Sequence, residues 1–169
     1  MKLIVIYYQK LMDNIFKYSY CQFVNDSKNL CSKSKGIFKL CSSSILNIIY
    51  IKANFQLLND SYSLELNILF SETYKLPVLY FIIYDNKTYT PINYESFKTE
   101  NNIDTKMINL CEISKENHPL NGNVYEFMHL CKLNQFINKV DDVDNILIFW
   151  SSIVLQLFNL DLSKIICMK

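Results

Sequence analysis

The sequence contains no arginine, and its 17 lysines nearly balance 16 acidic residues. A nucleic-acid binder or a protein of anionic membrane surfaces normally carries a basic patch, so the near-neutral charge indicates protein partners instead. The six cysteines, at positions 21, 31, 41, 111, 131 and 167, form no C-x-x-C pair, which argues against the usual zinc modules. We therefore expect no metal, no cofactor and a reducing, cytoplasmic location.

Long apolar runs are also missing. The run at residues 3–8 is shorter than a signal-peptide core and is followed at once by Gln9 and Lys10. The run at residues 146–158 is interrupted by serines and falls short of the roughly 20 residues that a spanning helix needs. The sequence therefore predicts neither a leader nor a transmembrane segment.

Half of the 169 residues are apolar, enough for one domain over residues 1–169 with a core that needs no disulfide or metal. The alternation from Tyr62 to Phe70, the clearest in the sequence, predicts a strand with one polar face, and the apolar run at 76–84 predicts a strand buried on both faces. Helical spacing predicts an opening helix at 5–19 and a closing helix at 143–158.

The remaining segments are assigned from turn residues and short apolar runs. We expect a loop at 25–35, strands at 36–41 and 45–53, a surface connection at 85–102 with a short helix near 94–98, an extended piece at 107–113, a turn-rich loop at 114–123, a short strand at 125–130 and a short helix at 132–138. The fold class is α+β, an antiparallel meander flanked by an N-terminal and a C-terminal helix.

Four motifs occur in a recognisable order: PVLYF at 77–81, ISKENHPLNG at 113–122, FMHLC at 127–131 and FWSSIVLQLFNLDLS at 149–163. In this order and spacing they resemble the autophagy-related protein 10 family of E2-like enzymes. The resemblance implies an E2-like fold and a thioester on Cys131. It also implies three partners: the ubiquitin-like autophagy protein 12, the E1-like autophagy protein 7 that supplies it, and autophagy protein 5, whose lysine accepts it. The family has His-Pro-Cys where this chain has His129, Leu130 and Cys131.

The chemistry of the residues supports the same cysteine. Cys131 follows a predicted strand and precedes a predicted helix, where backbone N-H groups favour a thiolate, and His129 and Lys132 are close in sequence. A cysteine after an apolar strand is otherwise simply buried. His129 alternates with Tyr125 and Phe127, and is either an acid-base group or a satisfied polar group inside the fold.

Supporting residues are sought among the polar groups expected beside the cysteine. Asn117 is either an oxyanion donor or a turn cap, and His118 and Asn121 lie in the same loop. The family resemblance implies that asparagine and tyrosine side chains assist the reaction, which adds Tyr80, although a tyrosine there also suits the core. The hairpin residues Tyr62, Leu64, Leu66, Pro77 and Tyr80 are candidates for partner binding, or else they form the core.

Several alternatives remain open. The chain is either a conjugating enzyme or an E2-like binding module that has lost conjugation. Leu130 in place of the family proline favours the binding module. A further candidate is the related E2-like enzyme that acts on the autophagy protein 8 group, although that enzyme usually has longer insertions. A cysteine protease using Cys131 is less consistent with the polar stretch at 138–142. A zinc site of Cys111, His118, His129 and Cys131 matches no usual spacing.

Overall fold

The computed structural model describes residues 18–103, 112–129 and 145–166, except for the side chain of His129. Its elements, in chain order, are α2 (Tyr20–Lys33), β1 (Phe38–Ser43), β2 (Ile48–Leu57), β3 (Tyr62–Ser71), β4 (Leu76–Asp85), β5 (Thr90–Ile92), α3 (Tyr94–Glu100), β6 (Glu112–Asn117), β7 (Val124–His129), α5 (Ile146–Leu155), the 3-10 helix η2 (Gln156–Phe158) and α6 (Leu162–Ile165). None of the helices in these ranges is long and apolar enough to cross a membrane.

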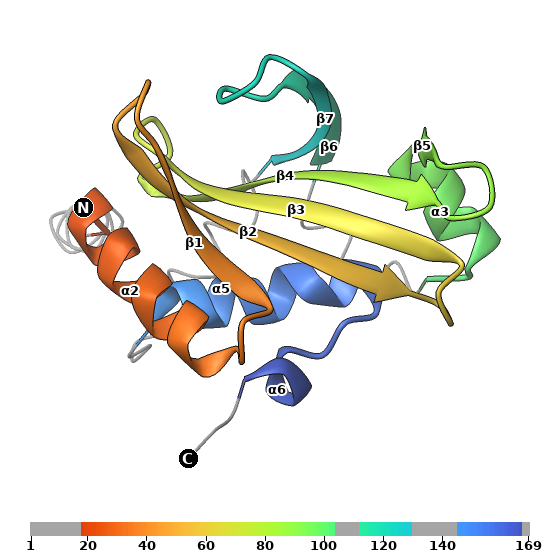
Figure 1. Cartoon of the computed structure of the whole chain (residues 1–169), viewed down its shortest axis with the longest axis horizontal. Helices are drawn as coiled ribbons and strands as arrows, with labels where there is room; N and C mark the ends of the chain where they lie inside the picture. Colours follow the sequence, from red (N-terminus) through yellow and green to blue (C-terminus); the bar gives the residue numbers. More distant parts are fainter. Residues whose placement is uncertain (1–17, 104–111, 130–144, 167–169) are drawn as a thin grey trace, which may run out of the picture.

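Within the described ranges, seven strands form one antiparallel sheet in the order β1-β2-β3-β4-β7-β6, with β5 paired to the end of β4 (Figure 1). The strands β1 to β4 follow one another as hairpins, as the alternating pattern predicts. The register joins Leu66 to Phe81 and Asn67 to Tyr80 across β3 and β4, and Tyr80 to Phe127 across β4 and β7. Because side chains alternate along each strand and paired residues share a side, Leu66 and Phe81 lie on one side of the sheet. Asn67, Tyr80 and Phe127 lie on the other.

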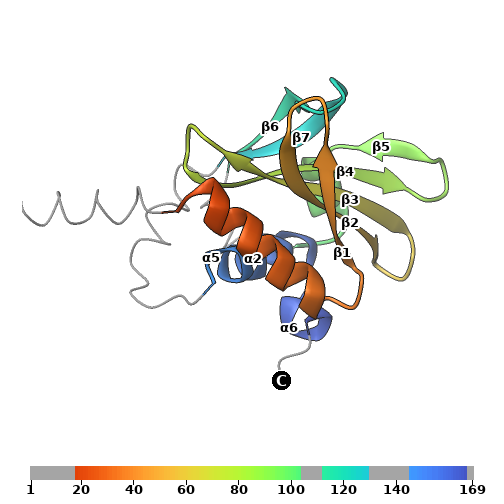
Figure 2. The same ribbon diagram turned by 60° about the vertical axis from the view of Figure 1, so that its left-hand side comes forward.

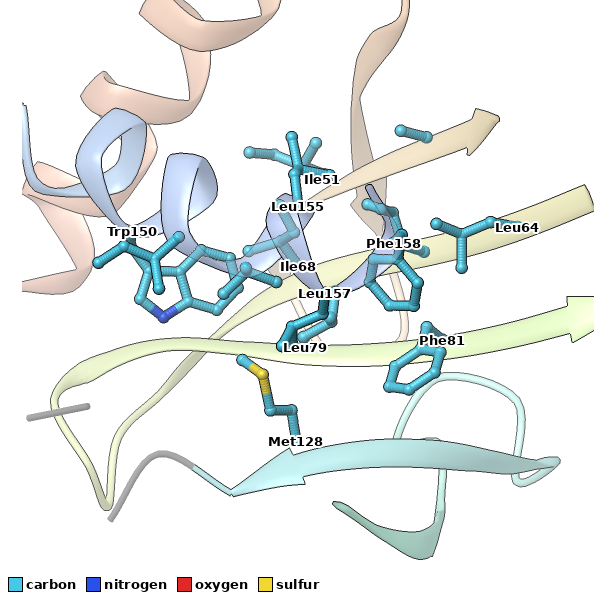
Figure 3. Close-up of a cluster of buried hydrophobic side chains, with 14 of the residues drawn as sticks. Ile51, Leu64, Ile68, Leu79, Phe81, Met128, Trp150, Leu155, Leu157 and Phe158 are labelled. Atoms are coloured by element: carbon cyan, nitrogen blue, oxygen red, sulfur yellow. The ribbon is translucent and has the colours of Figure 1, made fainter. Parts of the chain in front are cut away.

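The helices cover one side of the sheet, which we call the inner face. Figures 1 and 2 show α2, α5 and α6 together on this side, while β6 and β7 rise from the opposite side, the outer face. Leu79 and Phe81 of β4 point into the inner face, where Phe81 meets Phe158 with ring centroids 5.0 Å apart (Figure 3). Trp150 of α5 is fully buried in the same layer. The hydrophobic core is thus concentrated between sheet and helices.

The first described helix corrects two sequence-based expectations. Most of the predicted helix at 5–19 lies outside the described residues, and Ser19 is the N-cap of α2 rather than the end of a helix. Ser19 and Gln22 form a capping box, with bonds of 3.2 and 2.8 Å between side chains and backbone N-H groups. The predicted loop at 25–35 was wrong, because α2 continues through this polar stretch and buries Phe23, Ser27 and Leu30 on one face.

Other boundaries differ less. The strand predicted at 62–70 and the apolar strand at 76–84 are confirmed as β3 and β4, and α3 confirms the short helix near 94–98. The first part of the predicted loop at 114–123 was wrong, because β6 extends to Asn117. The closing helix is α5, which Asn145 caps through a 2.8 Å bond from the Ile148 N-H. The predicted helix at 132–138 lies outside the described residues.

Candidate functional site

Strand β7 connects the sheet to the candidate nucleophile. Cys131 lies outside the described residues, and the last described residue before it is His129, which pairs with Glu112 of β6. Along β7, Met128 pairs with Leu79 and is fully buried toward the inner face, whereas Tyr125 and Phe127 belong to the outer face. The chain therefore reaches Cys131 from a strand whose alternate side chains separate an apolar core from a more polar surface.

The turn between β6 and β7 is organised by His118. Its backbone N-H donates to the Asn123 carbonyl at 2.7 Å, and its own carbonyl accepts from Gly122 at 2.8 Å. Its ring nitrogen Nδ1 accepts from the Leu120 N-H at 3.2 Å. Gly122 has φ +71°, a conformation that glycine adopts without strain. The sequence His118-Pro119-Leu120-Asn121-Gly122 thus folds locally into a closed turn around the imidazole.

The His118 ring is held between two tyrosines on the outer face. Its centroid lies 4.9 Å from that of Tyr80 and 4.5 Å from that of Tyr125, and Tyr80 in turn lies 4.8 Å from Phe127. His118 is only 2% exposed. Aromatic rings at these separations stabilise one another beyond simple burial, so the four rings form a fixed cluster, which we call the outer aromatic cluster.

A chain of polar contacts continues from this cluster across the sheet. The Tyr125 hydroxyl donates to Glu65 Oε1 at 2.8 Å, and Lys52 Nζ forms an ion pair with the same oxygen at 3.1 Å. Asn67, 3% exposed, donates to it at 3.4 Å. Burial alone raises the pKa of Glu65, but the hydrogen bonds from Tyr125 and Lys52 outweigh that effect and hold its pKa below the usual value.

The same environment fixes the protonation of the neighbouring groups. Burial lowers the pKa of His118, an effect that the nearby Glu65 carboxylate only partly offsets. Because Nδ1 accepts a hydrogen bond, the neutral ring carries its proton on Nε2. Burial and the hydrogen bond to Glu65 raise the pKa of Tyr125 to about 12, and burial raises that of Tyr80. At neutral pH the cluster therefore offers N-H and O-H donors rather than a base.

The cluster borders a groove on the outer face with a volume of about 310 Å³. Its floor is formed by β2 and β3, one wall by the end of the β1-β2 hairpin, and the other wall by the β6-β7 turn; the lining includes Ser44, Ile45, Tyr50, Lys52, Glu65, Asn67, His118, Leu120, Asn121 and Tyr125. Figure 1 shows the β6-β7 turn curling over the sheet toward the β1-β2 hairpin. We call this space the outer groove.

The structure brings some of the predicted site residues together and separates others. Tyr80 and His118 are in ring contact, and Asn121 lines the outer groove beside them, where its Oδ1 accepts from the Asn123 N-H at 3.0 Å. Asn117 is exposed and pairs with Val124, and the register assigns both to the side of the hairpin opposite Tyr125 and Phe127. Asn117 thus does not join the cluster and does not cap the turn, which His118 and Asn121 close.

The proposed docking surface on the β3-β4 hairpin was wrong for most of its residues. Leu64 and Leu66 are each 1% exposed, and Pro77 is buried. Tyr62 is on the same inner face, where its ring contacts Phe97 and its hydroxyl donates to Glu100. The helices cover this side of the sheet, so the alternating apolar residues form the core. Tyr80 alone among the five belongs to the outer face.

The sequence analysis missed the polar residues that join the cluster to the sheet, namely Lys52, Glu65, Asn67 and Tyr125. Their signal was present, because Glu65 and Asn67 are the polar positions of the alternating strand β3 and therefore share its non-core face. The described residues contain no group of three or more His, Cys, Asp or Glu side chains placed to hold a metal ion. The zinc site considered above involves Cys111 and Cys131, which lie outside the described residues.

Comparisons with known proteins agree with this architecture. A family model described as "Autophagocytosis associated protein, active-site domain" matches residues 24–164. The chain is similar to the protein in the solution structures of KmAtg10, with 16% identity and a TM-score of 0.52, over 86% of this chain and 95% of that chain. This likeness confirms the expected fold, a seven-stranded antiparallel sheet with flanking helices. No curated protein matches the chain.

Proposed function

Because the chain belongs to the family of E2-like autophagy proteins that share this active-site domain, we propose that it carries a ubiquitin-like protein as a thioester on Cys131. The ubiquitin-like protein is autophagy protein 12, the donor is the E1-like autophagy protein 7, and the acceptor is a lysine of autophagy protein 5. The observation that carries the proposal is the family match over residues 24–164, a range that contains Cys131.

The reaction consists of two acyl transfers. First, the Cys131 thiolate attacks the carbonyl carbon of the donor thioester, a new C-S bond forms, and the cysteine thiolate of the E1-like enzyme leaves. Second, the amine of the acceptor lysine attacks the same carbon, a C-N bond forms, and the Cys131 thiolate leaves while the amine loses a proton to a base. The first step needs the thiolate form of Cys131 and the second step releases it, and the reducing cytosol, where we place the protein, keeps cysteines available.

The outer aromatic cluster fits this chemistry as a support rather than as a base. His118 has one ring nitrogen engaged with the Leu120 N-H and the other buried, so it has no accessible lone pair with which to deprotonate a thiol. The same geometry disfavours a protease that uses His118 as its base. Tyr80 and Tyr125 remain protonated at neutral pH, and their rings flank that of His118, the residue that closes the β6-β7 turn. They therefore hold this turn in place rather than act as bases.

The test is adduct formation with the purified E1-like enzyme, ATP and the ubiquitin-like protein, followed by a gel run without reducing agent. We expect a band that a thiol reagent removes, and for Cys131→Ser a slower adduct that resists the reagent because an oxyester replaces the thioester. Cys41→Ser, at a half-buried cysteine of β1, is the matched control and should behave like the wild type. A thiol-sensitive adduct that persists in Cys131→Ser would assign the reaction to another cysteine.

The alternative is an E2-like binding module without conjugation. Two observations favour it: Leu130 stands in place of the family proline, and Asn117, a candidate oxyanion donor, lies on the side of the hairpin opposite the outer aromatic cluster. This alternative predicts affinity for the ubiquitin-like protein with no adduct in the gel assay. Replacing autophagy protein 12 by a member of the autophagy protein 8 group in the same assay tests the related E2-like activity.

A further inference from the structure

Strand β4 has two different strands along one of its edges. β3 pairs with β4 along its whole length, from Leu76 to Asp85, so β7 and β5 share the opposite edge. β7 pairs with residues 79–81 of β4 and β5 pairs with residues 83–85, which leaves Ile82 between the two paired stretches. Figure 1 shows the β6-β7 hairpin rising away from the sheet, whereas β5 and α3 stay at its end. The sheet edge is therefore split at Ile82.

The split edge contains a cleft with a volume of about 510 Å³, which we call the edge cleft. One wall is formed by β5 and α3 and the other by the β6-β7 hairpin; the lining comprises Ile82, Pro91, Ile92, Asn93, Ser96, Glu100, Lys115, Val124, Tyr125 and Glu126. Tyr125 alone lines both this cleft and the outer groove, so the two spaces are distinct. Val124 is 60% exposed, and the edge cleft therefore offers apolar surface to a partner.

Two carboxylates of the edge cleft lack a cationic partner. None of the ion pairs among the described residues includes Glu126 or Glu100. Glu126 is half-buried, and burial raises its pKa, an effect that Lys115 and a hydrogen bond from the Tyr94 N-H only partly offset. Glu100 is exposed and accepts from the Tyr62 hydroxyl at 2.9 Å. Because Lys115 is the one cation in the lining, the edge cleft carries a net negative charge.

Apolar walls around unpaired carboxylates suit a lysine or arginine side chain. The aliphatic stem of such a side chain would lie against Val124, Pro91 and Ile82, and its charged head would reach Glu126 or Glu100. A cation at this position also stabilises the charged form of Glu126, which burial disfavours. An acidic ligand would instead meet two carboxylates, and like charges repel it.

The charge of the edge cleft indicates which partner of the proposed reaction it fits. The acceptor reacts through a lysine amine and must bring a cation, whereas the carried protein reacts through its terminal carbonyl and the E1-like enzyme through a thioester. Five residues of chain lead from Glu126 to Cys131 and span at most about 18 Å. An extended acceptor segment with its reacting lysine at Cys131 can therefore place a second basic residue, about five positions away, in the edge cleft.

We propose that the edge cleft binds a lysine or arginine side chain of the acceptor protein, other than the lysine that reacts, and thereby helps to select the acceptor. This inference rests on the proposed function. Binding at this distance from the reacting atoms leaves the bond-forming step unchanged, so it lowers the KM for the acceptor with little effect on kcat. Because the attraction acts between charges at a partly exposed cleft, salt weakens it.

Neutral variants of the two carboxylates test the edge cleft. Glu126→Gln keeps an acceptor for the Tyr94 N-H, and Glu100→Gln changes an exposed side chain. Glu72→Gln, at an exposed glutamate of the β3-β4 turn, is the matched control that removes the same charge outside the cleft. Binding of purified autophagy protein 5 to the full chain carrying Cys131→Ala is measured by titration at about 0.05 M and about 0.3 M salt. With Cys131 present, KM and kcat are measured separately for loading by the E1-like enzyme and for transfer to autophagy protein 5.

We expect each cleft variant to weaken acceptor binding and raise the acceptor KM by about fivefold, and the double variant by about twentyfold, with Glu72→Gln like the wild type. These differences should shrink at the higher salt concentration, and loading by the E1-like enzyme should stay unchanged. Acceptor binding by the double variant that equals that of Glu72→Gln overturns the inference, as does a defect confined to the loading step. The titration needs no thioester, so a missing adduct on Cys131 contradicts the proposed function while the titration still decides the role of the edge cleft.

Discussion

The two faces of the sheet bury different kinds of side chain, apolar ones on the inner face and polar ones on the outer face. The inner face packs Phe81, Leu79 and Met128 against α5 and η2, and these side chains are at most 1% exposed. The outer face buries His118 and Asn67 to nearly the same degree, beside the half-buried pair of Lys52 and Glu65. A dry apolar layer needs only shape complementarity, whereas a polar layer needs every group to be satisfied.

This difference assigns separate roles to the two faces. The inner face supplies most of the apolar burial and therefore most of the folding free energy. The outer face gains less from burial, but it holds donors, a carboxylate and a buried imidazole in fixed positions beside the outer groove. Polar groups of this kind are expected at functional sites rather than where stability alone is selected. The candidate site consequently lies on the face that contributes less to stability.

The largest expected difference in stability between the inner and outer faces is between two neighbouring residues of β4. Phe81→Ala removes a fully buried ring that contacts Tyr94 and Phe158, and we expect a loss of about 3–5 kcal/mol in the free energy of unfolding. Tyr80→Ala, on the outer face, should cost less because the tyrosine is only half-buried. Urea denaturation measures both. An equal loss for the two variants would mean that the outer face is as important to stability as the inner one.

A smaller effect is expected within the polar layer. Tyr125→Phe deletes the hydroxyl that donates to Glu65 and leaves the ring in place, and we expect a loss of about 1–2 kcal/mol because the acceptor is charged. Tyr89→Phe, at an 84% exposed tyrosine, is the control and should leave stability unchanged. If Tyr125→Phe also has no effect in urea denaturation, Glu65 is satisfied by Lys52, Asn67 and solvent, and the polar layer is looser than the distances indicate.

The sheet was predictable from the sequence because its strands follow the simplest periodicity. In β3 the apolar positions Leu64, Leu66 and Ile68 alternate with polar ones, and one buried face fixes the register. The helix α2 was not predictable from hydrophobic spacing, since the polar residue Ser27 lies between Phe23 and Leu30 on its buried face. Its capping box at Ser19 and Gln22 was a local signal that the pattern of apolar residues obscured.

The candidate site was only partly predictable, for a different physical reason. Motif similarity identified Tyr80, His118 and Asn121, which do lie on one face of the fold. Lys52 and Glu65 meet across the paired strands β2 and β3, but Tyr125 reaches Glu65 only because the β6-β7 hairpin curls over the sheet. No local pattern encodes that curl. Asn117 was misplaced because strand β6 extends to Asn117, four residues beyond the predicted end of the extended piece at 113, and the strand register directs its side chain to the other side.

The smallest expected effect is a pH dependence of the free energy of unfolding that only the outer face, through His118, should contribute. In the unfolded chain His118 has a pKa near 6.5, and burial lowers the pKa in the folded protein. Between the two values the unfolded state binds more protons, so the free energy of unfolding falls as the pH drops from about 7 through 6.5 toward the folded pKa. Inner-face residues such as Phe81 do not titrate and contribute nothing to this slope.

His118→Gln isolates this contribution, because glutamine stays neutral while the other titrating groups are retained. The pKa of Glu65 is held low, and Asp26 and Glu126 have raised pKa values, yet carboxyl groups of this kind change charge mostly below the histidine range. Urea denaturation at a series of pH values between about 5.5 and 7.5 should show a shallower slope for His118→Gln than for the wild type. Identical slopes would mean that His118 is as well solvated in the folded state as in the unfolded one. The outer face would then be open to water at the β6-β7 turn. The polar layer of the outer face would not exclude water as the apolar core of the inner face does, even around His118, which is 2% exposed.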